Sequence, residues 1–351
     1  MTAAMRIVHT SNFGDRAKGA FQHAVEFKIS NGLIRNGHAV ANFSDRAAAR
    51  SGAWLGHRAF GIRAATKAFL DFALAVRPDL IVFGHADSID AAALPEIRAA
   101  LPAVKMLQYS VDRIEPGNIA KLSAKLPFVD ATLVSTAGDA LKVFHRPGAR
   151  VGFLPNPVDW SIESARSDLA DAPPFDLIFP VGSDKRPRFT MGREWSGRDV
   201  LDAIARRLPK VKMRTPGARG EPTLIGGGYQ DALASAALGL NVSWRNDEYL
   251  YSSDRLAHFV GNGLVALVDR ATSYETLFKE GEFVYFSDID ELTGKIAALI
   301  GDPARRRAIA SAGRARYAEL FNERVIAKYV VDAAFGTVDR AALQWPSLYD
   351  F

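Results

Sequence analysis

Acidic and histidine side chains follow two predicted strands, at the points where the strands end. His85 and Asp87 come directly after the apolar run 79–84, and Asp112 follows the run 104–109. A His or Asp in such a position can take the proton of an attacking hydroxyl when it comes within about 3 Å of it. The alternative is that these side chains only cap the following helices. The residues alone leave both interpretations open.

A basic cluster follows a strand in the second half of the chain. Gly182 and Ser183 would let a ligand approach the backbone closely, and Lys185, Arg186 and Arg188 come next. Cations placed here can neutralise the negative charge that grows on a departing phosphate. The cluster therefore predicts a phosphate-binding loop, with an ordinary basic surface loop as the alternative.

The segment 252–258, Ser-Ser-Asp-Arg-Leu-Ala-His, precedes a Gly-Asn-Gly turn and is predicted to open a short helix. A Ser or Asp would cap this helix and leave its first amides for a phosphate. Arg255 and His258 are three residues apart and share one helical face. The candidates from this segment are Ser252, Ser253, Arg255 and His258, and a purely structural cap is the alternative.

The loop 10–19 after the first predicted strand leads into a helix and supplies Asn12, Phe13 and Asp15. Together with Arg113, these residues are candidates for contacting an acceptor or a phosphate, although an ordinary strand-to-helix turn is the alternative. The loop lacks the Gly-x-Gly-x-x-Gly fingerprint of dinucleotide-binding crossovers, which disfavours a nicotinamide enzyme.

Short apolar runs alternate with amphipathic stretches along the whole chain, which predicts strands joined by crossover helices and hence parallel, doubly wound sheets. Two prolines interrupt the pattern in Leu-Pro-Asn-Pro-Val-Asp at 154–159. We therefore predict an α/β protein with two Rossmann-like domains facing a cleft, over 1–155 and 160–320. The remaining segment, 321–351, is predicted to cross back to the first domain.

Composition limits the function classes. The chain has 351 residues, 48% of them apolar, a formal net charge of +5 and no cysteine. Disulfides, thiolate metal sites and cysteine nucleophiles are therefore excluded, and the histidines show no metal-binding spacing. No cofactor and no metal are expected. The surplus charge favours anionic partners, including peripheral contact with an anionic membrane, but no dense basic run predicts nucleic-acid binding.

The beginning of the chain runs directly into a predicted strand and has no signal-peptide pattern. No segment approaches the roughly 20 apolar residues that a membrane span needs. These features predict a cytoplasmic protein that would work at a membrane only from its surface.

The order of features from about 175 to 320 resembles the carboxyl-terminal domain of GT-B glycosyltransferases of the group 1 type, in particular the CgeB-like branch. The matching pieces are the strand at 175–182 followed by Arg186 and Arg188, Gly228-Tyr229, Ser253-Asp-Arg255, Gly261-Asn-Gly263, Tyr274-Glu275 and the tail from Asp302 to Tyr317. Leu154-Pro-Asn-Pro also resembles the usual junction between the domains.

The resemblance implies a glycosyltransferase whose second domain holds a nucleotide-sugar and whose first domain holds a glycan, lipid-linked or other surface-glycoconjugate acceptor. It adds Tyr229 and Glu275 to the donor-binding candidates. Two glutamates found in many retaining members are absent, since their positions fall at about Leu250 and His258, so retention of configuration cannot be carried over. A non-catalytic ligand-binding protein and a sugar-nucleotide epimerase are the alternatives.

Overall fold

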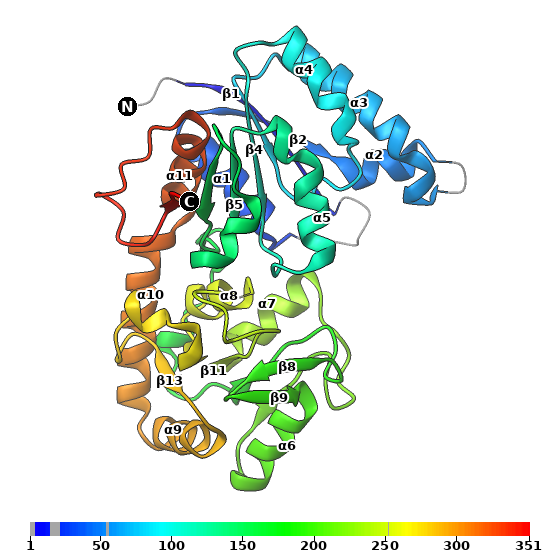
Figure 1. Cartoon of the computed structure of the whole chain (residues 1–351). Helices are drawn as coiled ribbons and strands as arrows, with labels where there is room; N and C mark the ends of the chain where they lie inside the picture. Colours follow the sequence, from blue (N-terminus) through cyan, green and yellow to red (C-terminus); the bar gives the residue numbers. More distant parts are fainter. Residues whose placement is uncertain (1–3, 15–21, 54–55, 252) are drawn as a thin grey trace. The chain divides into compact units, whose positions relative to one another are not determined.

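The protein is described by a computed structural model that covers residues 4–14, 22–53, 56–251 and 253–351. The chain divides into two compact units (Figure 1). The first unit consists of residues 1–157 together with 323–351, and the second consists of residues 158–322.

A parallel sheet forms the centre of the first unit. Its strand order is β14-β6-β5-β4-β3-β1-β2, and only β14 runs antiparallel to its neighbour. The strands are β1 (Arg6–Ser11), β2 (Ala39–Ser44), β3 (Leu80–Phe83), β4 (Lys105–Ser110), β5 (Ala131–Val134), β6 (Arg150–Phe153) and β14 (Leu348–Tyr349).

Helices cover this sheet, so the residues of its central strands are almost all buried. Every residue of β3, Leu-Ile-Val-Phe, is buried, as expected for a parallel strand enclosed on both faces. The covering α-helices are α1 (Val25–Arg35), α2 (Asp45–Ser51), α3 (Ile62–Val76), α4 (Leu94–Ala100), α5 (Pro116–Lys125) and α11 (Glu323–Phe335).

The second unit contains a smaller parallel sheet in the order β10-β7-β11-β12-β13 and a separate hairpin, β8-β9. The strands are β7 (Phe175–Ile178), β8 (Pro187–Thr190), β9 (Arg193–Ser196), β10 (Met213–Arg214), β11 (Ala236–Asn241), β12 (Val265–Asp269) and β13 (Val284–Phe286). The helices are α6 (Gly197–Arg207), α7 (Gly226–Ala234), α8 (Arg255–Gly261), α9 (Ile289–Gly301) and α10 (Pro303–Phe321).

Each sheet has one point where the direction of winding reverses. In the first unit the chain passes from β1 to β2 and then returns to place β3 on the other side of β1. In the second unit β10 and β11 lie on opposite sides of β7 in the same way. Open parallel sheets bind ligands in the crevice at the carboxyl ends of such strands. The loops after β1, β3, β7 and β11 are therefore the places to look for chemistry.

The predicted α/β class with two Rossmann-like domains is confirmed, but one part of the second domain differs from the prediction. The stretch 181–188 was expected to be a loop, whereas Arg188 lies on β8. Met191 and Gly192, both with positive φ, form the turn of the β8-β9 hairpin, as two-residue hairpin turns of the primed types require. A Met-Gly pair is a weak turn signal, which is why the sequence did not reveal the hairpin.

Helix α11 packs tightly against α1, although the two lie nearly three hundred residues apart in the sequence (Figure 1). A Cβ atom at Gly32 of α1 would lie 2.0 Å from the Glu323 carbonyl oxygen. Arg35 of α1 also forms an ion pair with Glu323 at 2.8 Å. The carboxyl-terminal helix is thus part of the core of the first unit.

We expect Gly32→Ala to destabilise the first unit by about 1–3 kcal/mol, because α1 and α11 would have to move apart to admit the methyl group. Urea denaturation followed by circular dichroism measures this change. Gly117→Ala in α5 is the matched control, because a Cβ there meets no atom within 4 Å. Equal stability of the two variants would contradict the close approach of the helices.

Candidate functional site

Arg255 begins α8 and lies beside the reversal point of the second sheet. Its guanidinium donates to the carbonyl oxygens of Pro180 at 3.0 Å and Val242 at 2.8 Å, and to Ser253 Oγ at 3.1 Å. Pro180 and Val242 belong to the segments that follow β7 and β11. Arg255 therefore ties together the two loops that border the crevice.

Two further arginines gather at the same place. Arg188 also donates to the Val242 carbonyl oxygen, at 3.0 Å, and its guanidinium lies over the ring of Trp244. The Arg186 guanidinium lies 5.2 Å from the centre of the same ring. Arg188 and Arg255 both face the ring of Phe179. We call Arg186, Arg188 and Arg255 the arginine cluster.

The arginine cluster carries positive charge that is not balanced locally. Burial, together with repulsion from Arg255, lowers the pKa of Arg188 to about 9. Within the described residues, none of the three guanidiniums forms an ion pair with a carboxylate, and the buried Arg188 Nε has no hydrogen-bond partner. An anion bound here would relieve both the repulsion and the unsatisfied donor.

His258 lies close to this cluster but is enclosed by protein. Only 1% of its side chain is exposed, and its Nδ1 lies 2.7 Å from Glu163 Oε1, a fully buried carboxylate. The ring also packs edge-on against Tyr229, whose burial raises its pKa above the usual range. The predicted donor residues Tyr229, Arg255 and His258 thus come together, while His258 interacts with Glu163 and Asp254.

The predicted capping of α8 is not what the structure shows. Asp254 occupies the N-cap position, yet its side chain makes no capping hydrogen bond. Its backbone angles there are already helical, whereas a capping side chain requires extended angles at this position. Ser252 lies outside the described residues.

The other predicted donor residues are placed as follows. The space beside the Gly182 Cα is open, since a Cβ there would meet no described atom within 4 Å. Ser183 accepts a hydrogen bond from the Lys185 amide, and Ser253 bonds to Ser243 as well as to Arg255. Glu275 lies exposed in the short helix at Tyr274–Thr276. Their roles remain predictions.

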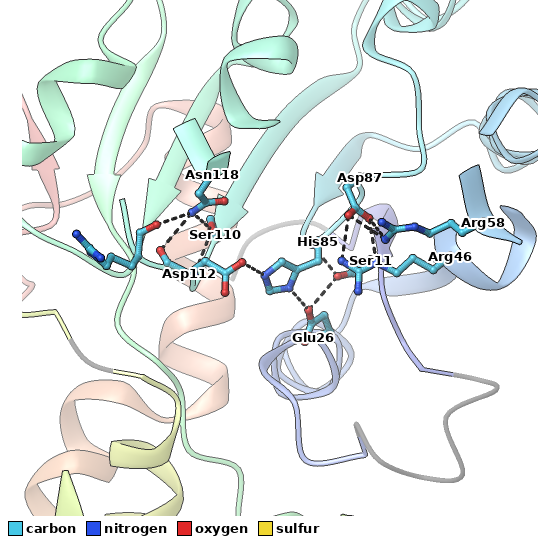
Figure 2. Close-up of polar contacts among 10 residues, drawn as sticks. Ser11, Glu26, Arg46, Arg58, His85, Asp87, Ser110, Asp112 and Asn118 are labelled. Carbon is cyan, nitrogen blue, oxygen red and sulfur yellow. Dashed lines mark hydrogen bonds and ion pairs between the residues drawn. The ribbon is translucent and has the colours of Figure 1, made fainter. Parts of the chain in front are cut away.

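In the first unit, His85 lies between two carboxylates at the reversal point of the sheet, as Figure 2 shows. Its Nδ1 lies 2.7 Å from Glu26 Oε1, and its Nε2 lies 3.0 Å from Asp112 Oδ2. Ser11, the last residue of β1, donates to Glu26 and accepts from the His85 amide. The ends of β1, β3 and β4 and the first turn of α1 thus build one polar group.

The two carboxylates keep His85 protonated. Burial acts to lower its pKa, but hydrogen bonds and charge attraction from Asp112 and Glu26 outweigh burial and raise the pKa to about 10. At neutral pH both ring nitrogens therefore carry protons, so the imidazolium cannot accept another one. In this state Asp112, whose side chain is 55% exposed, is the better placed proton acceptor.

Asp87 has a different environment from His85 although only one residue separates them. Arg46 holds both of its carboxylate oxygens, at 2.9 and 3.1 Å, and Arg58 also pairs with it (Figure 2). Although burial opposes the shift, Arg46 and Arg58 lower the pKa of Asp87. The alternative of helix capping is not seen for Asp87 or Asp112, because Asp90 and Glu115 occupy the next N-cap positions.

The remaining acceptor-side candidates lie near these groups or outside the described residues. Phe13 is buried and packs edge-on against His9 and Phe27, and Asn12 is also buried. The Arg113 carbonyl oxygen accepts from the Asn118 amide at 3.0 Å. Asp15 lies in the segment that the structure does not describe.

Sequence reasoning missed two buried glutamates, Glu26 and Glu163, each paired with a predicted histidine. Glu26 lies in the first turn of α1, the helix that follows β1. A carboxylate at the start of this helix could have been recognised from the sequence as a candidate. Glu163 lies in an irregular segment, where no periodicity marks which residues face inward. Its contact with His258 spans 95 positions and leaves no local pattern.

No cluster of three or more His, Asp or Glu side chains among the described residues is arranged to hold a metal ion. None of the described helices has both the length and the apolar character that crossing a bilayer demands.

We expect the stabilisation by His85 to decrease as pH rises. Its folded pKa of about 10 exceeds the unfolded value of about 6.5, so the contribution is complete below about pH 6.5 and is lost towards pH 10. In urea denaturation, the advantage of the wild type over His85→Gln should shrink by at most about 1.4 kcal/mol per pH unit. His57→Gln, at an exposed site, is the control, and an advantage that grows with pH would refute the raised pKa.

A comparison with known families matches most of the second unit and the beginning of α11. Residues 193–331 match the family described as glycosyl transferase-like. This stretch contains α8 with Arg255 and His258, as well as the helices α9 and α10. No curated protein matches the chain.

Solved structures share the fold of the whole chain. Sucrose-phosphate synthase from Thermosynechococcus elongatus is 13% identical, with a TM-score of 0.66 over 93% of this chain and 97% of its own. HepE from Anabaena, in complex with UDP-glucose, is 15% identical, with a TM-score of 0.59 over 95% and 100%. A glycosyltransferase from Rickettsia africae is 11% identical, with a TM-score of 0.58 over 96% and 100%.

At these identities the solved structures establish the fold, and the family match establishes the type of the second domain. The narrower likeness to the CgeB-like branch stays a prediction. Residues 193–331 thus match a glycosyl transferase-like domain, and the whole chain shares the two-domain fold of solved GT-B glycosyltransferases.

Proposed function

We propose that this glycosyltransferase moves a sugar from a nucleotide-activated donor to a glycan, lipid-linked or other surface-glycoconjugate acceptor. The observation that carries the donor part is the arginine cluster. It lies at the reversal point of the sheet, and its guanidiniums have no carboxylate partners within the described residues. A diphosphate is the chemical group that such a site is suited to hold, because guanidiniums bind phosphate oxygens in pairs.

The nucleotide is proposed to be uridine diphosphate as a first choice. The support is indirect, since the structurally similar Anabaena protein was solved in complexes with UDP and with UDP-glucose. In the proposed reaction, the acceptor oxygen forms a bond to the sugar C1 as the bond from C1 to the diphosphate oxygen breaks. The arginine cluster stabilises the charge on the departing nucleoside diphosphate.

The acceptor hydroxyl would lose its proton in the first unit. Asp112 is the proposed proton acceptor, because its carboxylate is more than half exposed whereas Glu26 is almost wholly buried. His85 donates hydrogen bonds to both carboxylates and fixes their positions. In this scheme His85 is a positioning residue and Asp112 is the base.

A lipid-linked acceptor would bring the protein to a membrane, and one surface of the first unit suits that contact. Phe60 is 77% exposed and Ile62 is also exposed, at the start of α3. Arg58 and Arg63 flank them and are exposed too. Apolar side chains within a basic surface are typical of binding to anionic lipid interfaces. We call these four residues the Phe60 surface.

We expect UDP to stabilise the protein against heat, by about 2.7 kcal/mol at a hundred times its dissociation constant. Arg186→Gln should weaken UDP binding by about tenfold, because it removes one exposed cation of the cluster. Arg206→Gln is the control, at an exposed position of α6. No thermal shift with UDP, other nucleoside diphosphates or cytidine monophosphate would contradict the proposal.

Release or transfer of sugar from UDP-glucose and other donors separates the enzyme from a non-catalytic binding protein. An enzyme should show a turnover that falls in Asp112→Asn with little change in UDP affinity, since Asp112 serves the acceptor. A nucleotide-dependent thermal shift without any turnover of any donor would favour the binding-protein alternative.

We expect the Phe60 surface to bind vesicles that contain phosphatidylglycerol more tightly than vesicles of phosphatidylcholine alone. Phe60→Ser should weaken this binding by about tenfold, because an exposed aromatic ring no longer enters the interface. Leu169→Ser removes an exposed apolar side chain from the second unit and serves as the control. Failure of the wild type to sediment with either vesicle would refute the contact.

A further inference from the structure

The first unit contains a cavity of about 30 Å³ that the scheme above does not use. It lies beside His85, between the segment after β3, the end of β4 and the helix α5. Cationic and polar side chains line much of it, among them Arg46, Lys121, Lys125 and Gln108. A cavity needs about 10–15 Å³ for each water molecule that it holds. This cavity therefore has room for two or three oxygen atoms but not for a sugar ring.

Lys125 is the most unusual residue of this cavity. It is only 8% exposed, yet within the described residues its ammonium forms no hydrogen bond and no ion pair. Burial lowers its pKa, although attraction by Asp45, Asp87 and Asp90 opposes that shift. Lysine is almost never buried without a partner, because an ammonium removed from water loses its hydration.

The Gln108 side chain also has a buried atom without a hydrogen-bond partner in the described part of the chain. The Gln108 amide nitrogen donates to the Leu122 carbonyl oxygen and to Thr132 Oγ1, which fixes the orientation of the side chain. Its Oε1 is buried and has no hydrogen-bond partner among the described residues. The cavity therefore offers an amide oxygen that is buried without a hydrogen-bond partner and an ammonium that no described residue pairs with.

The charges that line the cavity favour an anion. Arg46, Lys121 and Lys125 are cationic, and Asp87 is the only carboxylate among the described residues that line it. Asp87 is already held through both oxygens by Arg46 and is paired again by Arg58. The nearby Asp45 accepts from the Ser88 amide, and Asp90 caps the next helix. None of these carboxylates forms an ion pair with Lys121 or Lys125.

We propose that this cavity binds an anionic group of the acceptor, a phosphate or a carboxylate, through Lys125 and Lys121. The inference rests on the proposed function, because it makes the cavity a subsite for the acceptor. His85 also lines the cavity, so an anion held there leaves the attached sugar ring outside, next to His85 and Asp112. Gln108 Oε1 accepts a hydroxyl or a water that accompanies the anion.

Thermal stabilisation by inorganic phosphate tests the subsite, with chloride at matched ionic strength as the reference. Saturating UDP is present, so that the arginine cluster is occupied. The wild type should show a saturable phosphate response, and Lys125→Met should weaken it by about tenfold or more. Lys121→Met, at an exposed position, should weaken the phosphate response to a smaller extent. This second variant keeps the test decisive if Lys125→Met does not fold.

Lys67→Met is the matched control, because Lys67 is exposed in the same unit and pairs with Asp71. It should respond to phosphate like the wild type. No saturable phosphate response in the wild type would overturn the proposal, and so would an unchanged response in both Lys125→Met and Lys121→Met.

The UDP response of each variant, measured without phosphate, separates this proposal from the function itself. Lys125→Met should keep the UDP response of the wild type, because Lys125 belongs to the other unit from the arginine cluster. If UDP does not bind to the wild type at all, the proposed function fails. The phosphate titration, repeated without UDP, then still decides whether the cavity binds anions.

Paired ligands identify the source of the anion. Glucose 6-phosphate and glucuronate are compared with glucose as soluble ligands, and phosphatidylcholine vesicles with phosphatidic acid are compared with vesicles without it. Binding of the soluble anions that depends on Lys125 assigns the cavity to a soluble acidic sugar. Binding of phosphatidic acid alone, again dependent on Lys125, assigns it to a lipid phosphate. If neither pair of ligands shows a difference in binding that depends on Lys125, the proposal is overturned.

Discussion

The positive charge held at the reversal point of the second sheet is the constraint on which the site depends. Arg188 and Arg255 share one carbonyl oxygen, that of Val242, and one aromatic ring, that of Phe179. Placing the buried Arg188 beside the partly buried Arg255 opposes folding. The hydrogen bonds that compensate for this cost fix the loops after β7 and β11. If the cluster binds an anion as proposed, its guanidiniums are already fixed before the ligand arrives, which lowers the entropy cost of binding.

The first unit has the opposite arrangement of charges. There, two carboxylates converge, and the cation between them is a histidine rather than an arginine. A histidine can be shared by Glu26 and Asp112 because its two ring nitrogens point in opposite directions. Glu26 is anchored by Ser11 and buried, whereas Asp112 reaches solvent. The burial of one carboxylate fixes the ring, whereas the other carboxylate is 55% exposed.

The sequence predicted the elements well where apolar runs were long, as in β3 and β4. It placed His85 and Asp112 after the ends of strands and Arg255 at the start of a short helix. It could not predict their partners, because Glu26, Glu163 and Lys125 meet them only through the fold. Lys125 closes a helix in a position that suits a surface lysine, so nothing local shows that it is buried. The hairpin that carries Arg188 was missed because its turn has an unusual residue pair.

The first unit is assembled from two distant parts of the chain. Helix α11 fills its core beside α1, and β14 extends its sheet next to β6. During synthesis, residues 1–157 therefore leave the ribosome without the last helix and strand of their own domain. The second unit, which is contiguous, can complete its folding first. The amino-terminal part must wait, with the face of α1 around Gly32 uncovered, until α11 and β14 have been synthesised.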